Sequence, residues 1–429
     1  MKRIAILGGG VGGLVLARTL ADLGTGELVV FERAPEVGGK SCTIDIDGRP
    51  HDLGATMGVP LDYAHIVALG AEAGIATTAF PHEEHLALNG RAVALRRALE
   101  VPRVLVQASR YIALHRRTWR DGGLHRADPE LFDTWSAVAA RHRIDDASRR
   151  MLCYRTGYGY GFDDEVPAVM YASLIRPQTL LGLATGAPMM WQGGTQPIWK
   201  ALAKRLAARV EIRTSTQVTR IARAGGSVRV TSERDHRVSV ESFDRLVIAC
   251  DPQLVLPMLD ASAAEREWFS QVRTYPYSTF ACEIEGLAPG RAQVGYVDEN
   301  MRRDRAGHPM AWVKRYADRD IYVVHLFAPP EMPDAEIARR IGADVSRLGG
   351  RLVAVRAVRR WRFFPHFSSG FMREGGLAAI DRWQGQAGLY LTGEVLSFST
   401  MARVAEHAVA LAHRIAADVA ARRTTRLAS

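Results

Sequence analysis

The sequence contains few cysteines, and none of them belongs to a recognisable metal or disulfide motif. Four cysteines are spread over 429 residues, at positions 42, 153, 250 and 282. No two of them form a CxxC pair, and their wide spacing matches neither a zinc site nor a disulfide framework. The sequence therefore predicts four buried free thiols and no metal site.

Long apolar runs are also absent. No stretch is long enough to cross a bilayer, and no charged-then-apolar leader precedes the apolar residues 4–7. These features predict a soluble, cytoplasmic protein. The sequence carries no signal for the oligomeric state.

The chain has no dense block of basic residues, although its net charge is +10. The arginines are scattered, which is typical of solvated basic faces. Attraction to an anionic surface is the alternative, so peripheral contact with a membrane stays open as an interpretation. No basic-aromatic motif supports nucleic-acid binding, and we predict none.

The composition is otherwise that of a globular protein. Hydrophobic residues make up 47% and charged residues 24% of the chain. A length of 429 residues exceeds one small domain and suits two interleaved domains with substantial cores.

The first residues carry a glycine-rich turn between a strand and a helix. Residues 3–7 are apolar and strand-like, and residues 14–20 have helical spacing. Between them, Gly8, Gly10 and Gly13 fit the pattern GxGxxG. The first glycine permits the tight turn, the second lets the backbone approach a pyrophosphate, and the third lets the helix pack on the strand.

The residues after this turn complete a dinucleotide-binding unit. N–H groups at the start of the helix, around Val11 and Gly12, are free to bind phosphate oxygens. A second strand-like segment, residues 28–31, ends at Glu32. That carboxylate can accept hydrogen bonds from both ribose hydroxyls and would repel a 2′-phosphate, which argues against NADP.

The residues after Glu32 distinguish FAD from NAD. A glycine pair followed by a cation, within residues 33–40, precedes a Gly-Ala segment within residues 52–57. This arrangement resembles the second flavin signature of the amine-oxidase and phytoene-desaturase superfamily. The resemblance implies cofactor contacts from Arg33, Gly39, Lys40, Gly54, Ala55, Thr56 and Met57.

Later segments resemble the same superfamily. Residues 211–218 resemble the strand whose last apolar residue, Val218, holds the adenine through its backbone. Residues 246–250 read as a core parallel strand. Residues 389–394 resemble the final flavin strand, in which Gly393 precedes the acid that binds the ribityl chain, Glu394.

A helix predicted to begin near Met401 would direct its N-terminal dipole at the flavin, which favours negative charge on the reduced ring. Trp191 belongs to a further matching segment and is a predicted cofactor residue. No cysteine lies near Glu394. We therefore predict noncovalent FAD.

No second GxGxxG unit appears in the chain. A separate NAD(P)H-binding domain is therefore not expected. Electrons would have to come from the substrate itself.

A narrower resemblance extends along nearly the whole chain, to the flavin-dependent polyunsaturated fatty acid double-bond isomerases. The segments that carry it occur in the same order as in that family. They are residues 54–60, 157–168, 191–196, 295–302, 363–369 and 393–398.

This resemblance implies isomerisation of linoleic-type acids to conjugated dienes without net oxidation. Flavin N5 would remove a hydride from the methylene between two double bonds and return it at one end of the delocalised system. No protein acid or base is required. The protein would supply a dry apolar tunnel and a fixed geometry for an apolar small-molecule substrate.

The sequence departs from that family at two places. Where the family has a basic residue that meets the fatty acid carboxylate, residues 81–85 read Pro-His-Glu-Glu-His, so Glu83 and Glu84 replace a cation. The family's aromatic residue near the flavin is replaced within residues 180–183. The departures concern recognition of the fatty acid and not the redox-neutral chemistry.

The predicted fold is α/β, with a Rossmann-type FAD-binding domain, an inserted mixed-sheet substrate domain and a helical cap, as in amine oxidases. The FAD-binding domain is discontinuous, comprising residues 1–75, 191–255 and 375–425. Residues 76–110 and 256–374 are assigned to the substrate domain, and residues 111–190 to the cap.

Five residues are predicted to line the substrate site: Met57, Tyr158, Tyr160, Leu183 and Phe398. No catalytic residue is assigned, because the flavin would do the chemistry. His366 is interpreted as a structural histidine. Lys314 resembles in context the lysine that positions water near N5 in amine oxidases, but a surface lysine is the favoured interpretation.

The leading hypothesis is an FAD-dependent isomerase of polyunsaturated fatty acids or related lipids. Two alternatives stay open. One is an amine or amino acid oxidase that passes electrons to oxygen, and the other is a polyene desaturase.

Overall fold

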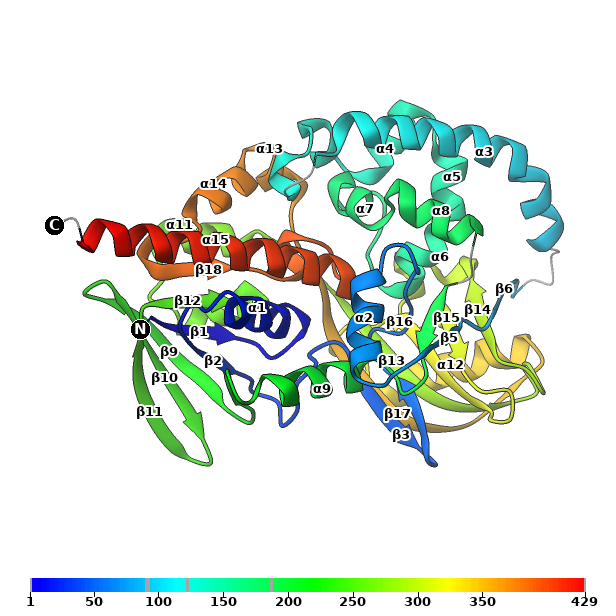
Figure 1. Cartoon of the computed structure of the whole chain (residues 1–429). Coiled ribbons are helices and arrows are strands. Elements are labelled where there is room, and N and C mark those ends of the chain that lie inside the picture. The colour runs from blue at the N-terminus through cyan, green and yellow to red at the C-terminus, as the bar shows by residue number, and fades with distance from the viewer. Residues whose placement is uncertain (1, 89–92, 121–122, 186–187, 428–429) are drawn as a thin grey trace.

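The structure is a computed structural model that describes residues 2–88, 93–120, 123–185 and 188–427. Figure 1 shows a parallel sheet with a long C-terminal helix on one side of the molecule, and a larger sheet below a layer of helices on the other. Both chain ends lie on the side of the parallel sheet.

The parallel sheet is assembled from distant parts of the chain. Its strand order is β18-β12-β1-β2-β8. Apolar residues occupy successive positions of the central strands, because both faces of the sheet are covered. The strands are β1 (Arg3–Leu7), β2 (Glu27–Phe31), β8 (Glu211–Arg213), β12 (Arg245–Ile248) and β18 (Leu389–Leu391).

Helices cover one face of this sheet. Ile4 and Ile6 of β1 pack in one cluster with apolar residues that include those of three helices. The alternate residues, Ala5 and Leu7, face a second cluster that continues into the helical layer. The three helices are α1 (Val11–Asp22), α9 (Gln196–Leu206) and α15 (Met401–Leu427).

The prediction of a single strand over residues 211–218 is wrong, because the segment is divided between two strands. It divides into β8 and β9 (Gln217–Ala224), which lie in different sheets. Ser215 has φ +50°, a left-handed conformation that interrupts an extended strand. Val218 therefore lies in a three-stranded antiparallel sheet with β10 (Ser227–Arg234) and β11 (Arg237–Phe243).

The larger sheet has the order β17-β13-β16-β15-β14-β6. One face packs against α12 (Asp334–Arg347), and the other carries an aromatic cluster that includes Tyr158 and Tyr277. Edge strand β6 is parallel to β14. The strands are β6 (His82–Leu86), β13 (Val272–Glu285), β14 (Gln293–Val297), β15 (Ala311–Lys314), β16 (Ile321–Phe327) and β17 (Arg351–Phe367).

The helical layer lies above this sheet in Figure 1. Helix α3 continues without a break through residue 110, the predicted limit between the substrate domain and the cap. The helices are α3 (Val93–Thr118), α4 (Trp135–His142), α5 (Asp145–Arg150), α6 (Leu152–Arg155), α7 (Ala168–Leu174) and α8 (Pro177–Thr185). Within the described part of the chain, no helix combines the length and apolar character needed to cross a membrane.

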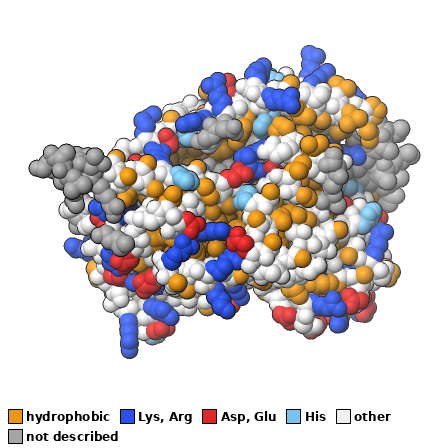
Figure 2. Space-filling view, in the orientation of Figure 1, with side chains coloured by type: hydrophobic (Ala, Val, Ile, Leu, Met, Phe, Trp, Pro, Cys, Tyr) orange, Lys and Arg blue, Asp and Glu red, His pale blue; other side chains and the backbone are white. Residues whose placement is uncertain are grey.

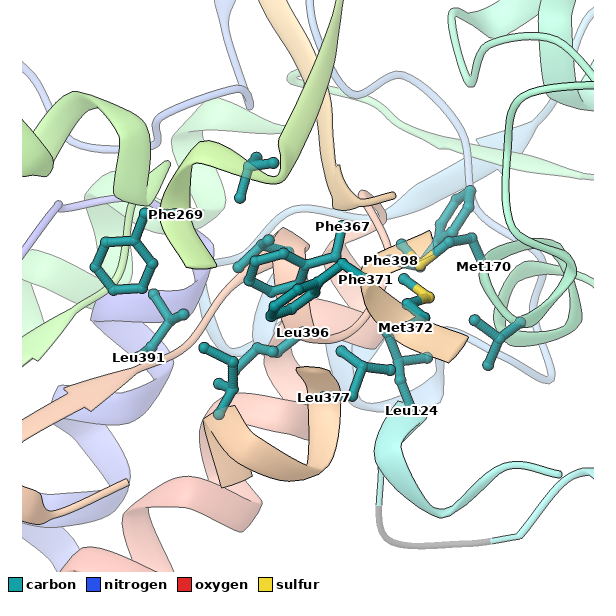
Figure 3. Close-up of a cluster of buried hydrophobic side chains, with 14 of the residues drawn as sticks. Leu124, Met170, Phe269, Phe367, Phe371, Met372, Leu377, Leu391, Leu396 and Phe398 are labelled. Atoms are coloured by element: carbon teal, nitrogen blue, oxygen red, sulfur yellow. The ribbon is translucent and has the colours of Figure 1, made fainter. Parts of the chain in front are cut away.

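Shorter elements connect these layers. Figure 3 shows Leu396 and Phe398, which follow β18, among side chains of α13, α14 and α7. These elements are β3 (Thr43–Ile46), β4 (Arg49–Asp52), β5 (Thr77–Ala79), β7 (Met189–Trp191), α2 (Ala64–Glu72), α10 (Pro252–Val255), α11 (Ala263–Ser270), α13 (Ser369–Arg373) and α14 (Gly376–Trp383).

Candidate flavin and substrate site

The glycine turn between β1 and α1 requires glycine for steric reasons. A Cβ on Gly13 would lie 1.9 Å from the carbonyl oxygen of Gly8, so no other residue fits at this close approach of helix and strand. Gly10 forms a bridge with Gly38, and a Cβ on Gly39 would lie 3.1 Å from the Cα of Gly10. Two backbone loops thus meet without side chains at the start of α1, where Val11 and Gly12 present free N–H groups.

Glu32 is held in place beside this turn. Its carboxylate accepts hydrogen bonds from the backbone N–H of Gly9 and of Ala34, both at 2.8 Å. Each oxygen keeps a lone pair for a further donor. The predicted ribose acid is therefore fixed in orientation, whereas the side chain of the neighbouring Arg33 is exposed.

Lys40 and Glu394 bring the second glycine loop to the end of β18. The two side chains form an ion pair, and Ser399 donates a hydrogen bond of 3.0 Å to Glu394. Gly393 has φ +101°, a conformation that favours glycine. Met401 begins α15, and its sulfur lies 3.5 Å from the hydroxyl of Ser41. These predicted cofactor residues therefore lie together.

The predicted flavin segment at residues 54–57 is anchored by an ion pair that the sequence analysis missed. Arg315 contacts the carboxylate of Asp52 at 3.0 Å, and both side chains are buried. Burial raises the pKa of Asp52, an effect that Arg315 opposes. Arg315 also donates to the carbonyl of Trp191. No local pattern signals this contact, because 263 residues separate the two charges.

Side chains and backbone around Asp52 extend this support. Thr195 donates its backbone N–H to Asp52 at 2.9 Å and its hydroxyl to the carbonyl of Ala55 at 2.8 Å. Thr56 donates to the carbonyl of Gly54 at 3.0 Å. A Cβ on Gly54 would lie 1.8 Å from the carbonyl of Lys40. The Gly-Ala segment therefore lies directly against the loop that carries Lys40.

The indole of Trp191 points into the core beside α2. It is fully buried, and its ring centroid lies 6.1 Å from that of Tyr63. Its Nε1 has no hydrogen-bond partner. The backbone of Trp191, rather than its ring, contacts Arg315 of the site.

Aromatic rings gather next to Lys40 and Glu394. The Phe398 ring lies 4.7 Å from Tyr160 and 5.0 Å from Phe364. Tyr160 lies 5.4 Å from Phe363, over which the Lys40 ammonium sits at 5.4 Å. Phe364 has φ +53°, which is strained for a bulky residue. Strain of this kind clusters at functional sites.

A second aromatic group continues from Phe363 along the large sheet. Tyr277 stacks on Phe363 at 4.9 Å, and Met57 and Tyr158 pack in the same cluster. Four of the five predicted substrate residues thus lie in two adjoining aromatic clusters. Leu183 is half-buried on α8 and belongs to neither cluster.

The two acids that replace the expected entrance cation face different surroundings. Glu83 accepts hydrogen bonds from Tyr296 at 2.6 Å and from Tyr154 at 2.5 Å. Glu84 pairs with Arg291 at 2.8 Å. The half-buried carboxylate of Glu83 lies among tyrosines at the edge of the aromatic cluster. It would bind a ligand that donates a hydrogen bond or carries a positive charge better than it would bind the carboxylate of a fatty acid.

The sequence profile of the flavin containing amine oxidoreductases matches residues 11–420. The chain belongs to this family. Its members carry a flavin. The glycine turn, Glu32, Lys40 and Glu394 are the residues predicted to hold it, and they lie close together. The predicted amine-oxidase-like fold is confirmed.

Several solved structures share the fold. A CLA-producing fatty acid isomerase from P. acnes superposes with a TM-score of 0.88 at 26% identity, covering 96% of this chain and 98% of the other. Putrescine oxidase gives 0.72 at 16%, covering 98% and 99%. Cyclohexylamine oxidase from Brevibacterium oxydans gives 0.69 at 14%, covering 99% of both chains. The predicted resemblance to the isomerases is confirmed.

A curated relative carries an amine-oxidase name. A Mycobacterium tuberculosis protein, AofH, described provisionally as a flavin-containing monoamine oxidase, is 29% identical over 276 residues. The match covers 58% of this chain and spans about three fifths (59%) of that protein.

The lysine considered for an oxidase-type role in this family does not reach the aromatic cluster. Lys314 is fully buried, so the favoured interpretation as a surface residue was wrong. It donates to Asp320 and to the carbonyl of Ala288, both at 2.7 Å. Along β15, Val313 faces the aromatic cluster and Trp312 faces α12. Alternation therefore places Lys314 on the α12 side.

His366, interpreted above as a structural histidine, is buried and bonded to the backbone. Burial lowers its pKa to about 4, so the ring is neutral near pH 7. Its Nδ1 lies 2.8 Å from the carbonyl oxygen of Phe364, and the two rings stack at 4.5 Å. These contacts support the strained backbone at Phe364.

Val218 is buried at the start of β9, and the side chain of Gln217 donates to its carbonyl oxygen at 2.7 Å. The adenine contact predicted for its backbone stays a prediction.

Proposed function

We propose that this enzyme is a noncovalent FAD-dependent isomerase that moves a double bond in polyunsaturated fatty acids or related lipids. The likeness to the P. acnes fatty acid isomerase over 96% of the chain, at 26% identity, carries the proposal. Glu32 supports FAD, because its two fixed oxygens suit an adenosine ribose.

When bound, the flavin supplies hydride removal from the methylene between two double bonds and hydride return at one end of the five-carbon system. The residues around it bind, orient and exclude water. Phe398, Tyr160 and Phe363 provide an apolar surface, because water would capture a carbocation. His366 is neutral and bonded to backbone, consistent with chemistry that needs no protein base.

A labelling experiment tests the proposal. Linoleic acid deuterated at the methylene between its double bonds is incubated with the flavin-loaded enzyme without oxygen. The label should appear at a terminal carbon of the conjugated diene system, with no NAD(P)H consumed and no hydrogen peroxide formed. Because Glu83 stands where a cation was expected, the panel includes uncharged esters and shorter dienes.

An amine oxidase is the second candidate, and Glu83 is the observation that favours it. Its carboxylate between Tyr154 and Tyr296 has the chemistry of an ammonium site. Lys314 counts against it, because its ammonium is bonded on the other face of the sheet. Anaerobic incubation separates the activities. An isomerase needs no acceptor, an oxidase stops after one turnover, and a polyene desaturase stops without a quinone-like acceptor.

If no diene is isomerised, but an amine reduces the flavin and peroxide accumulates in air, the isomerase proposal is wrong and the oxidase candidate stands.

A further inference from the structure

A cavity of about 440 Å³ lies between the helical layer, α14 and α15, and part of its wall belongs to the cluster that also contains Phe398. Its size falls within the range of small-molecule sites. Leu396 and Ser397, which follow Glu394 directly, form part of its wall, and Arg403 lines it from the first turn of α15. The cavity therefore adjoins the segment assigned to the flavin.

Much of the wall is aliphatic. Leu124 comes from the helical layer, Leu377 and Ile380 from α14, and Leu411 from α15. Figure 3 shows Leu124, Leu377 and Leu396 beside one another in the buried cluster that joins these elements. These side chains form a surface on which a hydrocarbon chain can pack.

Buried arginines occupy another part of the wall. The Arg403 side chain is 3% exposed and pairs with Asp62 at 2.5 Å and with Glu406 at 2.7 Å. Arg176 pairs with Glu406 at 3.1 Å and lies over the ring of Trp119 at 5.5 Å. Burial, and then the charge of Arg403, lower the pKa of Arg176. The guanidinium groups of Arg176 and Arg403 therefore lie close enough to repel each other.

Arg176 has unused hydrogen-bonding capacity. Its buried Nε has no hydrogen-bond partner, whereas Nη2 of Arg403 already contacts Asp62. Leaving charged donors unsatisfied costs free energy, which an added acceptor would recover. A guanidinium has the fork geometry that matches a carboxylate.

The remaining charged groups do not neutralise this excess. Arg414 is bonded to Asp381 at 2.6 Å. Burial lowers the pKa of His125 and lowers that of His407 to about 4, so both rings are neutral near pH 7. Arg126 also lines the cavity. Four arginines line the cavity together with two carboxylates, those of Asp381 and Glu406, and a third carboxylate, Asp62, pairs with Arg403 from outside the lining.

We propose that this cavity holds the carboxylate end of a long-chain fatty acid, with Arg176 bonded to the carboxylate and the acyl chain on the leucines. The choice of ligand rests on the proposed function. The site supplies the cation that the β6 edge lacks, where Glu83 and Glu84 lie instead. The acid would thus be recognised beside α15 rather than beside β6.

Binding of a saturated acid tests this inference without turnover. Decanoate has no double bond to move, so its binding does not depend on isomerase activity, and diene isomerisation can be measured without it. The flavin-loaded protein is titrated with decanoate and with decanol by calorimetry, and decanoate should bind at least tenfold more tightly. Binding should also change the fluorescence of Trp119, and Trp119→Phe should remove that change.

Variants locate the carboxylate. Arg176→Gln should abolish the preference for decanoate over decanol, and Arg176→Lys should retain part of it. Arg414→Gln is the matched control, since Arg414 lines the same cavity but is already bonded to Asp381, and it should leave the preference unchanged.

Several outcomes would overturn the inference. They are equal binding of acid and alcohol, an unchanged preference in Arg176→Gln, or displacement of decanoate by inorganic phosphate at equal concentration, which would indicate a small-anion site. If Arg176→Gln fails to fold, the comparison of decanoate with decanol in the wild-type protein and the change in Trp119 fluorescence still test the inference.

Discussion

At the scale of single residues, Glu32 makes the most direct connection between sequence and cofactor. Its side chain already bonds two backbone N–H groups that shape the glycine turn. A ribose would add two hydrogen bonds to the same charged group. Binding and local geometry therefore depend on one carboxylate.

Glu32→Ala should weaken FAD binding by roughly ten- to a hundredfold, since lost charge-assisted hydrogen bonds cost about 1.5–3 kcal/mol. Fluorescence titration of the apoprotein with FAD measures the change. Glu27→Ala, on the same strand but exposed and paired with Arg3, should bind FAD normally. Equal affinity in Glu32→Ala and wild type would refute the assignment.

Residues with local signals were predictable, and residues with distant partners were not. Gly8, Gly13 and Glu32 follow one another in a strand-turn-helix-strand unit whose geometry depends on neighbours in sequence. The buried pair of Arg315 and Asp52 has no such signature, because it forms only when the end of β15 meets the end of β4.

At the scale of elements, strand alternation decides which of two adjacent basic residues reaches the site. Lys314 and Arg315 follow one another, yet the lysine bonds Asp320 on one side of the sheet and the arginine bonds Asp52 on the other. Only Lys314 was a candidate from the sequence, because its place in a strand is visible there. The register that separates the two side chains depends on pairing of β15 with β14 and β16.

Lys314→Met should therefore destabilise the protein without altering flavin chemistry. The carbonyl of Ala288 loses its charged donor, a change of about 1–3 kcal/mol in the free energy of unfolding. Reoxidation of the reduced flavin by oxygen should stay within about twofold of wild type, because an uninvolved residue leaves the barrier unchanged. Urea unfolding and stopped-flow absorbance measure the two quantities.

Lys200→Met is the control, since that lysine forms an exposed pair with Glu36, and it should change neither quantity. A tenfold slower reaction with oxygen in Lys314→Met alone would favour the oxidase candidate.

At the scale of the whole molecule, buried histidines should make stability depend on pH. Burial lowers the pKa of His51, His366 and His407 to about 4 and that of His325 to about 3. The unfolded chain binds protons near pH 6.5, whereas the folded chain does not until the pH is much lower. Stability is therefore full above pH 6.5 and falls as the pH drops toward 4.

Each of these histidines should contribute up to about 1.4 kcal/mol per pH unit to that loss. Urea unfolding at pH 7 and pH 5.5 measures it. His366→Asn should show a shallower dependence than wild type, whereas His236→Gln, at a fully exposed position, should not. A free energy of unfolding that stays constant or rises on acidification would contradict this interpretation.

The outer face of the helical layer bears on the question of membrane contact. Helix α3 exposes Leu105 by 65% and Val106 by 54%, close to the exposed Arg103 and Arg110. Figure 2 shows basic side chains along the upper edge of the molecule, where Figure 1 places the helical layer. Apolar and basic side chains together are typical of a surface that meets anionic lipid. An enzyme acting on lipids would gain from such contact.

We therefore expect the protein to sediment with vesicles that contain phosphatidylserine, and less so as salt screens the attraction. Changing Leu105 and Val106 together to Glu should reduce binding at least tenfold, because the apolar contact is lost and like charge is added. The matched control changes Val238 and Val240 to Glu, since these residues of β11 are exposed to a similar degree, 65% and 59%. No binding by the wild-type protein, or an equal loss in both variants, would show that α3 is an ordinary solvated face.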